Sequence, residues 1–124
     1  KKLQFSGAQH LELINFCKKK KIEFLSTPYN VEDAKILVNL GIKKFKTSSA
    51  DLTDYFLHNF LSRNAEEVII STGMSNLKEI SNTLKIYNKK KIKITLLHCV
   101  SNYPCSDESL NLNVIKTLKL SFLI

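Results

Sequence analysis

The stretch Val68-Ile69-Ile70-Ser71-Thr72-Gly73-Met74-Ser75 decides the fold that this sequence predicts. Its β-branched apolar run ends abruptly in small polar residues, and a helical pattern begins shortly afterwards. A buried parallel strand ends in this way where hydroxyls and backbone N–H groups are presented at its carboxyl end. Many α/β proteins contain one such turn, so the prediction depends on whether the neighbouring segments repeat it.

The same order of apolar run, polar residues and helical spacing recurs along the chain. Four strands are expected, over residues 22–25, 42–45, 67–70 and 92–97. Five helices are expected, over residues 7–20, 31–40, 52–61, 77–87 and 112–120. Strands that begin 20 to 25 residues apart and alternate with helices pair in parallel. The sequence therefore predicts an α/β fold of about four consecutive parallel βα units.

Local signals mark several of the helix ends. Asn30 and Asn76 are expected to be N-caps, because a short polar side chain precedes the helical spacing at both positions. Glu79, three residues after Asn76, has the spacing of a capping box. Gly41 is expected to close the second helix.

A parallel βα repeat of this kind fits two architectures. One is an open doubly wound sheet, and the other is part of a (β/α)₈ TIM barrel. A whole barrel needs about 200 to 250 residues, so a chain of 124 residues has room for about half of one. The periodicity of strands and helices does not distinguish the two architectures. The residues at the strand ends are therefore needed to distinguish them.

The composition is that of one ordinary globular domain. Apolar residues make up 44% and charged residues 24% of the chain, and no interior linker divides it. The three cysteines form no Cys-x-x-Cys pair, which argues against a disulfide framework and a structural zinc site. No apolar run approaches the length of about 18 residues that a membrane helix needs, and no signal-peptide pattern opens the chain. We therefore expect a cytoplasmic protein without a membrane partner.

The net charge of +8 comes almost entirely from lysine, and Arg63 is the only arginine. Such a charge is typical either of a surface for nucleic acid or another anion, or of a solvated lysine-rich surface. No aromatic residues interleave with the clusters Lys18–Lys21 and Lys89–Lys91, as a platform for stacked bases requires. We therefore favour the solvated surface and expect no nucleic-acid partner.

Polar residues follow each of the expected strands. The carboxyl ends of parallel strands meet at one edge of a sheet, so these residues are expected to line one cleft. Their hydroxyls, the N-termini of the following helices and Lys46 together suit an anion, most simply a phosphate. Asp51 lies just beyond Lys46 and is suited to bind the hydroxyls of a sugar or polyol. The residues at the four strand ends are Ser26, Thr27, Lys46, Ser48, Ser49, Ser71, Thr72, His98, Ser101 and Tyr103.

Several of these residues also have a purely structural interpretation. Thr27 precedes a proline and can make a turn, and Ser71 or Thr72 can cap the following helix. Lys46 can be a solvated loop lysine, and a histidine in the place of His98 is more often a hydrogen-bonded core residue than a ligand. The recurrence of polar residues after four successive strands favours a shared site over four separate explanations.

Four blocks of sequence, in this order and at this spacing, closely resemble the sialic acid synthase family, which includes synthases of N-acetylneuraminic, legionaminic and pseudaminic acids. The blocks are Phe24–Tyr29, Phe45–Asp51, Ile70–Ser75 and Leu97–Pro104. The resemblance implies a (β/α)₈ barrel that condenses phosphoenolpyruvate with an N-acetylated hexosamine-type sugar and releases phosphate. It also implies a divalent metal, Mn or Mg, as Lewis acid, and a homodimer.

The resemblance also assigns roles residue by residue. Phosphoenolpyruvate-binding positions of the family match Thr27, Lys46, Ser49, Ser71 and Ser101. Sugar-contacting positions of the family match Asp51, where the family often has Glu, and Tyr103. No catalytic residue and no metal ligand is assigned to this chain.

Other parts of the family's pattern have no match in this chain. The family's acidic residue and lysine on the first strands would precede Lys1, and its metal-binding histidines would follow Ile124. Residues 1–124 are therefore expected to be a middle segment of the catalytic barrel, roughly its third to sixth strands, with no second domain. We expect the isolated segment to be inactive and marginally stable or self-associating, because a half-barrel leaves sheet edges and core uncovered.

Two other functions remain open. One is a different phosphate-binding barrel enzyme of the aldolase type, which would form a Schiff base through Lys46. The other is a basic nucleic-acid-binding module, which the near absence of arginine and of stacking aromatics makes the least favoured.

Overall fold

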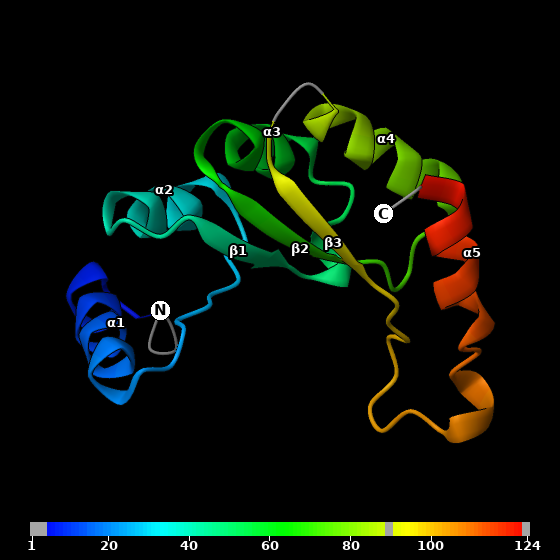
Figure 1. Cartoon of the computed structure of the whole chain (residues 1–124), viewed down its shortest axis with the longest axis horizontal. Helices are drawn as coiled ribbons and strands as arrows, with labels where there is room; N and C mark the ends of the chain where they lie inside the picture. The colour runs from blue at the N-terminus through cyan, green and yellow to red at the C-terminus, as the bar shows by residue number, and fades with distance from the viewer. Residues whose placement is uncertain (1–4, 89–90, 123–124) are drawn as a thin grey trace.

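The computed structural model describes residues 5–88 and 91–122 and confirms the α/β fold (Figure 1). Within these residues, the elements are, in chain order, α1 (Gly7–Lys20), α2 (Val31–Asn39), β1 (Lys44–Thr47), the 3₁₀ turn η1 (Ser49–Asp51), α3 (Tyr55–Asn64), β2 (Glu67–Ser71), α4 (Leu77–Tyr87), β3 (Lys93–Leu97), the 3₁₀ turn η2 (Asp107–Ser109) and α5 (Asn113–Phe122). In this part of the chain, no helix has the length and apolar character needed to cross a membrane.

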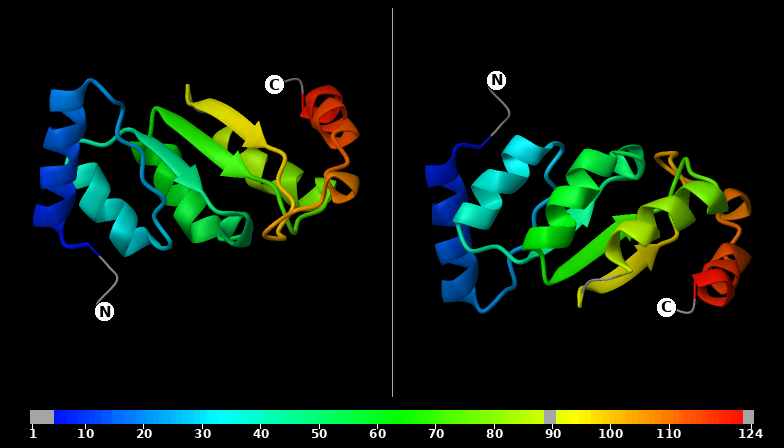
Figure 2. Two further views of the ribbon diagram at one scale, coloured as in Figure 1. Left: turned by 90° about the horizontal axis from the view of Figure 1, so that it is seen from below. Right: turned by 90° about the horizontal axis from the view of Figure 1, so that it is seen from above.

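The three strands of the described residues form one parallel sheet in the order β1–β2–β3. The register places Lys44 beside Glu67, and Glu67 beside Lys93. Helix α3 connects β1 with β2, and α4 connects β2 with β3. All three strands therefore end at the same edge of the sheet, as Figure 2 shows from two opposite sides.

The predicted helix ends are confirmed by their caps. Asn30 accepts a hydrogen bond from the backbone N–H of Asp33 at 2.8 Å, at the start of α2. Asn76 and Glu79 form a capping box at the start of α4, in which each side chain accepts from the backbone N–H of the other. Gly41, just beyond α2, has a φ of 83°, a conformation that glycine adopts without steric cost.

Helices α2, α3 and α4 cover one face of the sheet, and the hydrophobic core lies between them and the strands (Figure 1). Alternate strand residues, such as Phe45 of β1 and Val68 of β2, are fully buried in this core. Leu57 and Leu61 of α3, which the sequence predicts to share one helix face, belong to the same buried cluster. Full burial of a side chain of this size stabilises the fold by about 1.5–3 kcal/mol.

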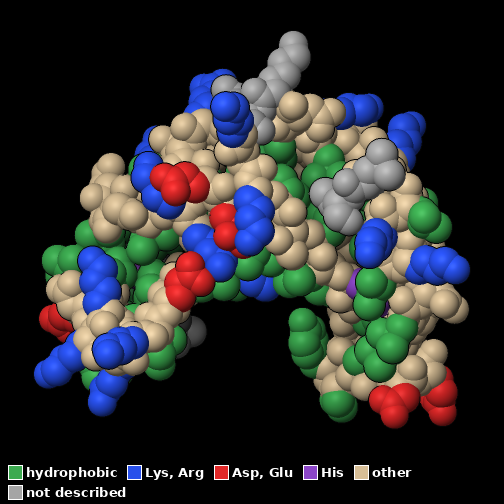
Figure 3. Space-filling view, viewed as in Figure 1, with side chains coloured by type: hydrophobic (Ala, Val, Ile, Leu, Met, Phe, Trp, Pro, Cys, Tyr) green, Lys and Arg blue, Asp and Glu red, His purple; other side chains and the backbone are tan. Residues whose placement is uncertain are grey.

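The opposite face of the sheet is open in the described part of the chain. Helices α1 and α5 project beyond it at the two ends, and the space-filling view shows the hollow between them (Figures 1 and 3). Strand alternation and register place Lys44 and Lys46 of β1 and Glu67, Ile69 and Ser71 of β2 on this face. The sheet is thus covered on one side only, whereas a doubly wound sheet carries helices on both.

The first predicted strand is wrong. Residues 22–25 form no strand, and this segment pairs with β1 only through a single parallel bridge between Ser26 and Phe45. Ile22 and Leu25 remain 65% and 42% exposed, so the segment buries little of its apolar surface. A segment that leaves this much apolar surface exposed gains too little burial to favour a regular ladder. The four predicted strands are therefore three strands and one bridge in the described residues.

The third helix also begins later than predicted, at Tyr55 instead of residue 52. Residues Ser49–Asp51 first form the turn η1. Asp54 then caps α3, because its carboxylate accepts a hydrogen bond from the backbone N–H of Leu57 at 3.0 Å. The extra turn places Ser49 and Asp51 between the end of β1 and the start of α3.

Candidate functional site

Ser71 is the last residue of β2, at the edge where the strands end. Its side chain is 2% exposed, and its hydroxyl has no hydrogen-bond partner among the described residues. The hydroxyl of Thr47 also lacks a partner there, but strand alternation places Thr47 on the helix-covered face. A buried hydroxyl without a partner costs about 1–3 kcal/mol, so Ser71 is a candidate for binding a ligand on the open side.

Thr72 has a structural role instead. Its backbone N–H and its hydroxyl both donate to the carbonyl of Leu97, at 3.0 and 2.9 Å, and so extend the pairing of β2 with β3. Neither Ser71 nor Thr72 caps α4, because Asn76 does. The helix-cap interpretation of these two residues is therefore wrong.

Gly73 is the point at which the ends of all three strands come together. A Cβ atom at this position would lie 2.8 Å from Oγ of Ser49, which follows β1, and 2.7 Å from Oγ of Ser101, which follows β3. It would also lie 3.1 Å from the carbonyl oxygen of Cys99. The structure thus brings together two of the predicted phosphoenolpyruvate-binding hydroxyls. They meet at Gly73, which lies two residues after Ser71 in the chain.

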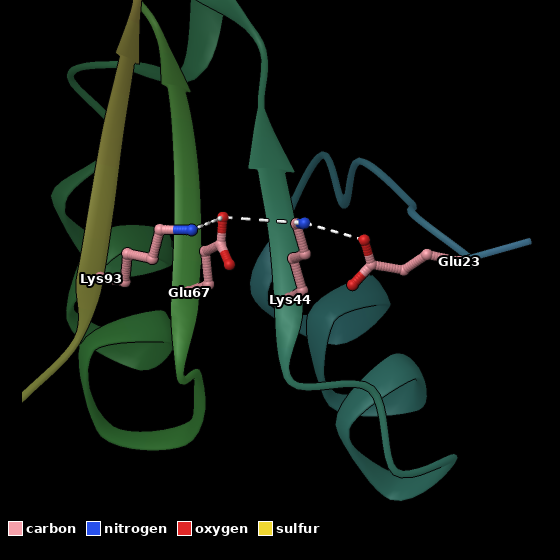
Figure 4. A network of polar contacts seen from close by, with 4 residues as sticks. All are labelled: Glu23, Lys44, Glu67 and Lys93. Carbon is pink, nitrogen blue, oxygen red and sulfur yellow. Dashed lines mark hydrogen bonds and ion pairs between the residues drawn. The ribbon is translucent and has the colours of Figure 1, made fainter.

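A row of alternating charges crosses the open face at the opposite, amino-terminal ends of the strands (Figure 4). The Lys44 ammonium lies 2.9 Å from a carboxylate oxygen of Glu23 and 3.7 Å from one of Glu67, and Lys93 lies 3.3 Å from the same oxygen of Glu67. The hydrogen bond to Glu23 raises the pKa of Lys44 above its ordinary value. The lysines of this row are therefore neutralised by neighbouring carboxylates.

Lys46 lies two residues beyond Lys44 on the same face, nearer the carboxyl ends of the strands. Its neighbours in the register are Ile69 and Thr95, which carry no charge. Its ammonium forms no ion pair with any residue in the described ranges 5–88 and 91–122. The half-buried Lys46 thus provides a free positive charge on the face that also carries Ser71.

Asp51, the predicted sugar-binding acid, is held by its own turn. The hydroxyl of Ser48 donates to a carboxylate oxygen of Asp51 at 2.6 Å. The Asp51 carboxylate is partly exposed and therefore has further acceptor positions for a ligand's hydroxyls.

Thr27 and Tyr103 lie on two loop segments beside the sheet. Thr27 lines a pocket of about 460 Å³ with Phe5, His10 and Tyr29, between α1 and α2. Tyr103 is 90% exposed, on the loop that follows Ser101. Neither residue supplies one of the three atoms nearest to the Cβ position of Gly73, but Thr27 directly follows Ser26, whose carbonyl accepts from the backbone N–H of Lys46 at 3.3 Å.

His98 has the hydrogen-bonded structural role that the sequence favours. Its Nε2 donates to the backbone carbonyl of Leu110 at 2.6 Å and so ties the end of β3 to the residues before α5. Within the described residues, no group of three His, Cys, Asp or Glu side chains is arranged to hold a metal ion. The described residues therefore do not fit the divalent metal that the family resemblance implies.

The sequence does not predict two buried polar contacts that lie beneath the turn η1. Thr83 of α4 donates to the backbone carbonyl of Leu52 at 2.7 Å, and His58 of α3 contacts the hydroxyl of Tyr87 at 2.8 Å. The only signal in the sequence is that Thr83 and His58 occupy positions where the helical spacing calls for apolar residues.

Comparison with known proteins identifies relatives along the whole chain. A model of the NeuB family matches residues 1–124. The chain is 39% identical over 124 residues to the N,N'-diacetyllegionaminic acid synthase of Campylobacter jejuni, and 35% identical over 128 residues to that of Legionella pneumophila. Each alignment covers 98% of this chain, but only 37% and 36% of the two relatives.

Solved structures show the same relationship. The crystal structure of N-acetylneuraminic acid synthetase from Leptospira borgpetersenii, in complex with citrate, superposes with a TM-score of 0.92 at 34% identity, over 96% of this chain and 42% of that one. The spore coat polysaccharide biosynthesis protein SpsE of Bacillus subtilis superposes with a TM-score of 0.89 at 26% identity, over 97% and 34%. The family resemblance read from the four sequence blocks is therefore confirmed, and this chain belongs to the NeuB family.

Proposed function

We propose that this chain provides the phosphate-binding part of a synthase that condenses phosphoenolpyruvate with an N-acetylated hexosamine-type sugar to a nonulosonic acid. The observation that carries the proposal is that the Ser49 and Ser101 hydroxyls meet at Gly73, two residues along the chain from Ser71, whose hydroxyl is buried and has no partner among the described residues. The uncompensated charge of Lys46 on the same face adds the attraction that a phosphate requires.

In the proposed reaction, C3 of phosphoenolpyruvate attacks the aldehyde carbon of the sugar, and a new carbon–carbon bond forms. Water then adds to C2, and the C2–O bond to the phosphate breaks, so that inorganic phosphate leaves with the bonding electrons. The three serine hydroxyls and Lys46 would hold the phosphate throughout, since hydroxyl donors and a point charge bind it equally well before and after bond cleavage. We assign these residues to binding and orientation, which brings the reacting atoms together.

Asp51 and Tyr103 are proposed to contact the sugar. Asp51 lies on the same turn as Ser49, and Tyr103 lies two residues beyond Ser101, so both are close in sequence to a phosphate-binding residue. The family resemblance also implies a divalent metal that polarises the sugar aldehyde. Because the described residues do not fit a metal ion, we assign no step of the reaction to one.

We further propose that the sheet is a section of a (β/α)₈ barrel whose interior is the open face. Helices on one side only, and strand ends that carry the candidate site, are the arrangement of such a barrel. The chain covers 42% of the solved Leptospira synthetase, which agrees with the proposal of a segment. A cytoplasmic location remains a prediction of the sequence pattern, and a homodimeric whole protein remains a prediction of the family resemblance.

The proposal is tested by measuring the affinity of the chain for phosphoenolpyruvate by calorimetry. Lys46→Ala removes a charge-assisted contact and is expected to weaken binding by at least about tenfold. Lys78→Ala removes the same charge from an exposed position on α4 and is expected to leave the affinity unchanged. Equal affinities of both variants and the wild type, or no binding to the wild type at millimolar ligand, would contradict the proposal.

A second experiment distinguishes the proposal from the aldolase-type alternative. In an enzyme of that type, the half-buried and unpaired Lys46 would form the Schiff base with the substrate. Borohydride treatment with a keto substrate would then link the substrate covalently to Lys46. For a phosphate-binding lysine, we expect no covalent product.

A further inference from the structure

The turn η1, which carries Ser49 and Asp51, rests on two buried polar side chains from the helix layer. Thr83, in the middle of α4, donates its hydroxyl to the carbonyl of Leu52 at 2.7 Å. Leu52 is the residue that closes the turn, and its backbone N–H bonds back to the carbonyl of Ser49 at 3.4 Å. Thr83 and Leu52 are both fully buried, so this hydrogen bond is shielded from water.

Thr83 lies inside a helix, and its hydrogen-bond partner is unusual for a threonine in that position. Such a side chain commonly bonds the carbonyl one turn earlier in its own helix. Thr83 instead bonds a residue 31 positions earlier in the chain, on another element. The bond therefore fixes the distance between α4 and the turn η1.

A second contact supports the same turn from α3. His58 is fully buried, and its Nδ1 lies 2.8 Å from the hydroxyl of Tyr87, with the two rings packed edge to face. Burial lowers the pKa of His58 and raises that of Tyr87, so both side chains are neutral at pH 7. The two neutral groups share one hydrogen bond through Nδ1, and Nε2 of His58 takes no part in it.

The backbone of Asp51 in η1 lies close enough to His58 to oppose the lowering of its pKa by burial. No hydrogen bond joins them, since Nε2 of His58 has no partner among the described residues and the Asp51 carbonyl accepts from the N–H of Asp54 at 3.0 Å. The helix layer thus bonds the turn at the Leu52 carbonyl through Thr83 and places His58 close to Asp51. The packing beneath η1 fixes where the turn lies.

We propose that Thr83, supported by the His58–Tyr87 pair, is a positioning residue that sets the place of the Ser49 hydroxyl in the phosphate site. This inference rests on the proposed function, because it takes the hydroxyls at Gly73 as that site. The Ser49 Oγ lies 2.8 Å from the Cβ position of Gly73, so the place of the turn sets the place of one of the two hydroxyls that meet there.

The experiment compares Thr83→Val, Thr83→Ser and wild type, with Ser62→Ala as the control. Valine preserves the volume of Thr83 and removes the hydroxyl, and serine restores the hydroxyl. Ser62 is also buried, but its hydroxyl donates to the carbonyl of Asn59 within α3, away from the turn. Each variant is measured twice: by the NMR shifts of the backbone amides of residues 49–52 without ligand, and by the affinity for phosphoenolpyruvate.

We expect Thr83→Val to move the amide resonances of residues 49–52 and to weaken phosphoenolpyruvate binding by about tenfold, or about 1.4 kcal/mol. Thr83→Ser is expected to restore both readouts, and Ser62→Ala to change neither. Unchanged amide resonances in Thr83→Val would overturn the inference, as would full affinity in a variant whose turn has moved.

The two readouts separate the inference from the function on which it rests. If wild type binds no phosphoenolpyruvate, the proposed function fails, and the amide shifts still decide whether Thr83 fixes the turn. If wild type binds phosphoenolpyruvate, and Thr83→Val changes neither the amide shifts nor the affinity, the proposed function stands and the positioning role is refuted.

Discussion

Gly73 has room for a hydrogen atom and for little else, because the hydroxyls of Ser49 and Ser101 approach the place where a side chain would begin. Its backbone φ is not in the left-handed region, so the requirement for glycine comes from this close approach and not from backbone conformation. The residue marks the narrowest point of the candidate site.

Gly73→Ala is therefore expected to displace both hydroxyls. We predict a loss of stability of about 1–3 kcal/mol from overpacking, together with weaker binding of phosphoenolpyruvate. Gly7→Ala is the matched control, because a Cβ on Gly7 would meet only Cγ2 of Ile36 at 3.7 Å, an ordinary contact. Urea unfolding and calorimetry on both variants test the prediction, and a Gly73→Ala protein as stable as Gly7→Ala would contradict it.

The sequence predicts the central residues of the site better than its outer ones. The sheet topology alone brings three serines to the same edge, because Ser71 ends β2 while Ser49 and Ser101 follow β1 and β3. The same reasoning places Thr27 and Tyr103 after strand-like segments, but in the structure Thr27 lines the pocket between α1 and α2, and Tyr103 lies on an exposed loop. Their side-chain positions depend on loop packing, which has no local signal in the sequence.

At the scale of elements, helices α3 and α4 are joined through a buried polar contact, the His58–Tyr87 pair. Its members lie 29 residues apart in the chain, so local sequence patterns do not predict it. The helix boundaries, by contrast, are local, and the caps at Asn30 and Asn76 are where the sequence predicts them. The strand at residues 22–25 fails as a prediction because strand formation depends on how much apolar surface the segment buries against the rest of the fold, and an apolar run does not reveal this.

The buried histidine makes stability depend on pH. Burial lowers the pKa of His58 below its ordinary value of 6.5, while the Asp51 carbonyl and the carboxylates of Asp51 and Asp54 oppose the shift and Tyr87 stays neutral. The unfolded chain then binds a proton more readily than the folded one below pH 6.5. We predict full stability above that pH, and a loss of at most about 1.4 kcal/mol per pH unit from this residue as the pH falls below it.

Urea unfolding between pH 8 and pH 5 measures this dependence. His58→Asn is expected to flatten the decline, whereas His10→Asn, a substitution at a partly exposed position on α1, is expected to leave it in place. A decline of the same size in all three proteins would show that His58 is not its source.

At the scale of the whole molecule, one face of the sheet remains uncovered, and β3 has no strand partner on its outer side, in the described part of the chain (Figures 1 and 2). A groove of about 570 Å³ runs between the outer strand β3 and α5, with Leu96 and Leu118 among its lining residues. Ile115 of α5, in the same groove, is 53% exposed. Uncovered strand edges and apolar grooves favour association with other chains.

We therefore predict that the isolated 124-residue chain is marginally stable and self-associates. Sedimentation velocity at increasing concentration is expected to show a rising mean mass, reduced by Ile115→Lys in the groove and not by Leu77→Lys on the surface of α4. A chain that stays monomeric and unfolds cooperatively at every concentration would contradict the interpretation of this sheet as a section of a larger barrel.

The most direct test of the central claim is a crystal structure of the chain with phosphoenolpyruvate. The phosphate oxygens are predicted to lie within about 3 Å of the hydroxyls of Ser49, Ser71 and Ser101 and of the Lys46 ammonium. A ligand that binds in the α1–α2 pocket beside Thr27, with these three hydroxyls unoccupied, would contradict the claim.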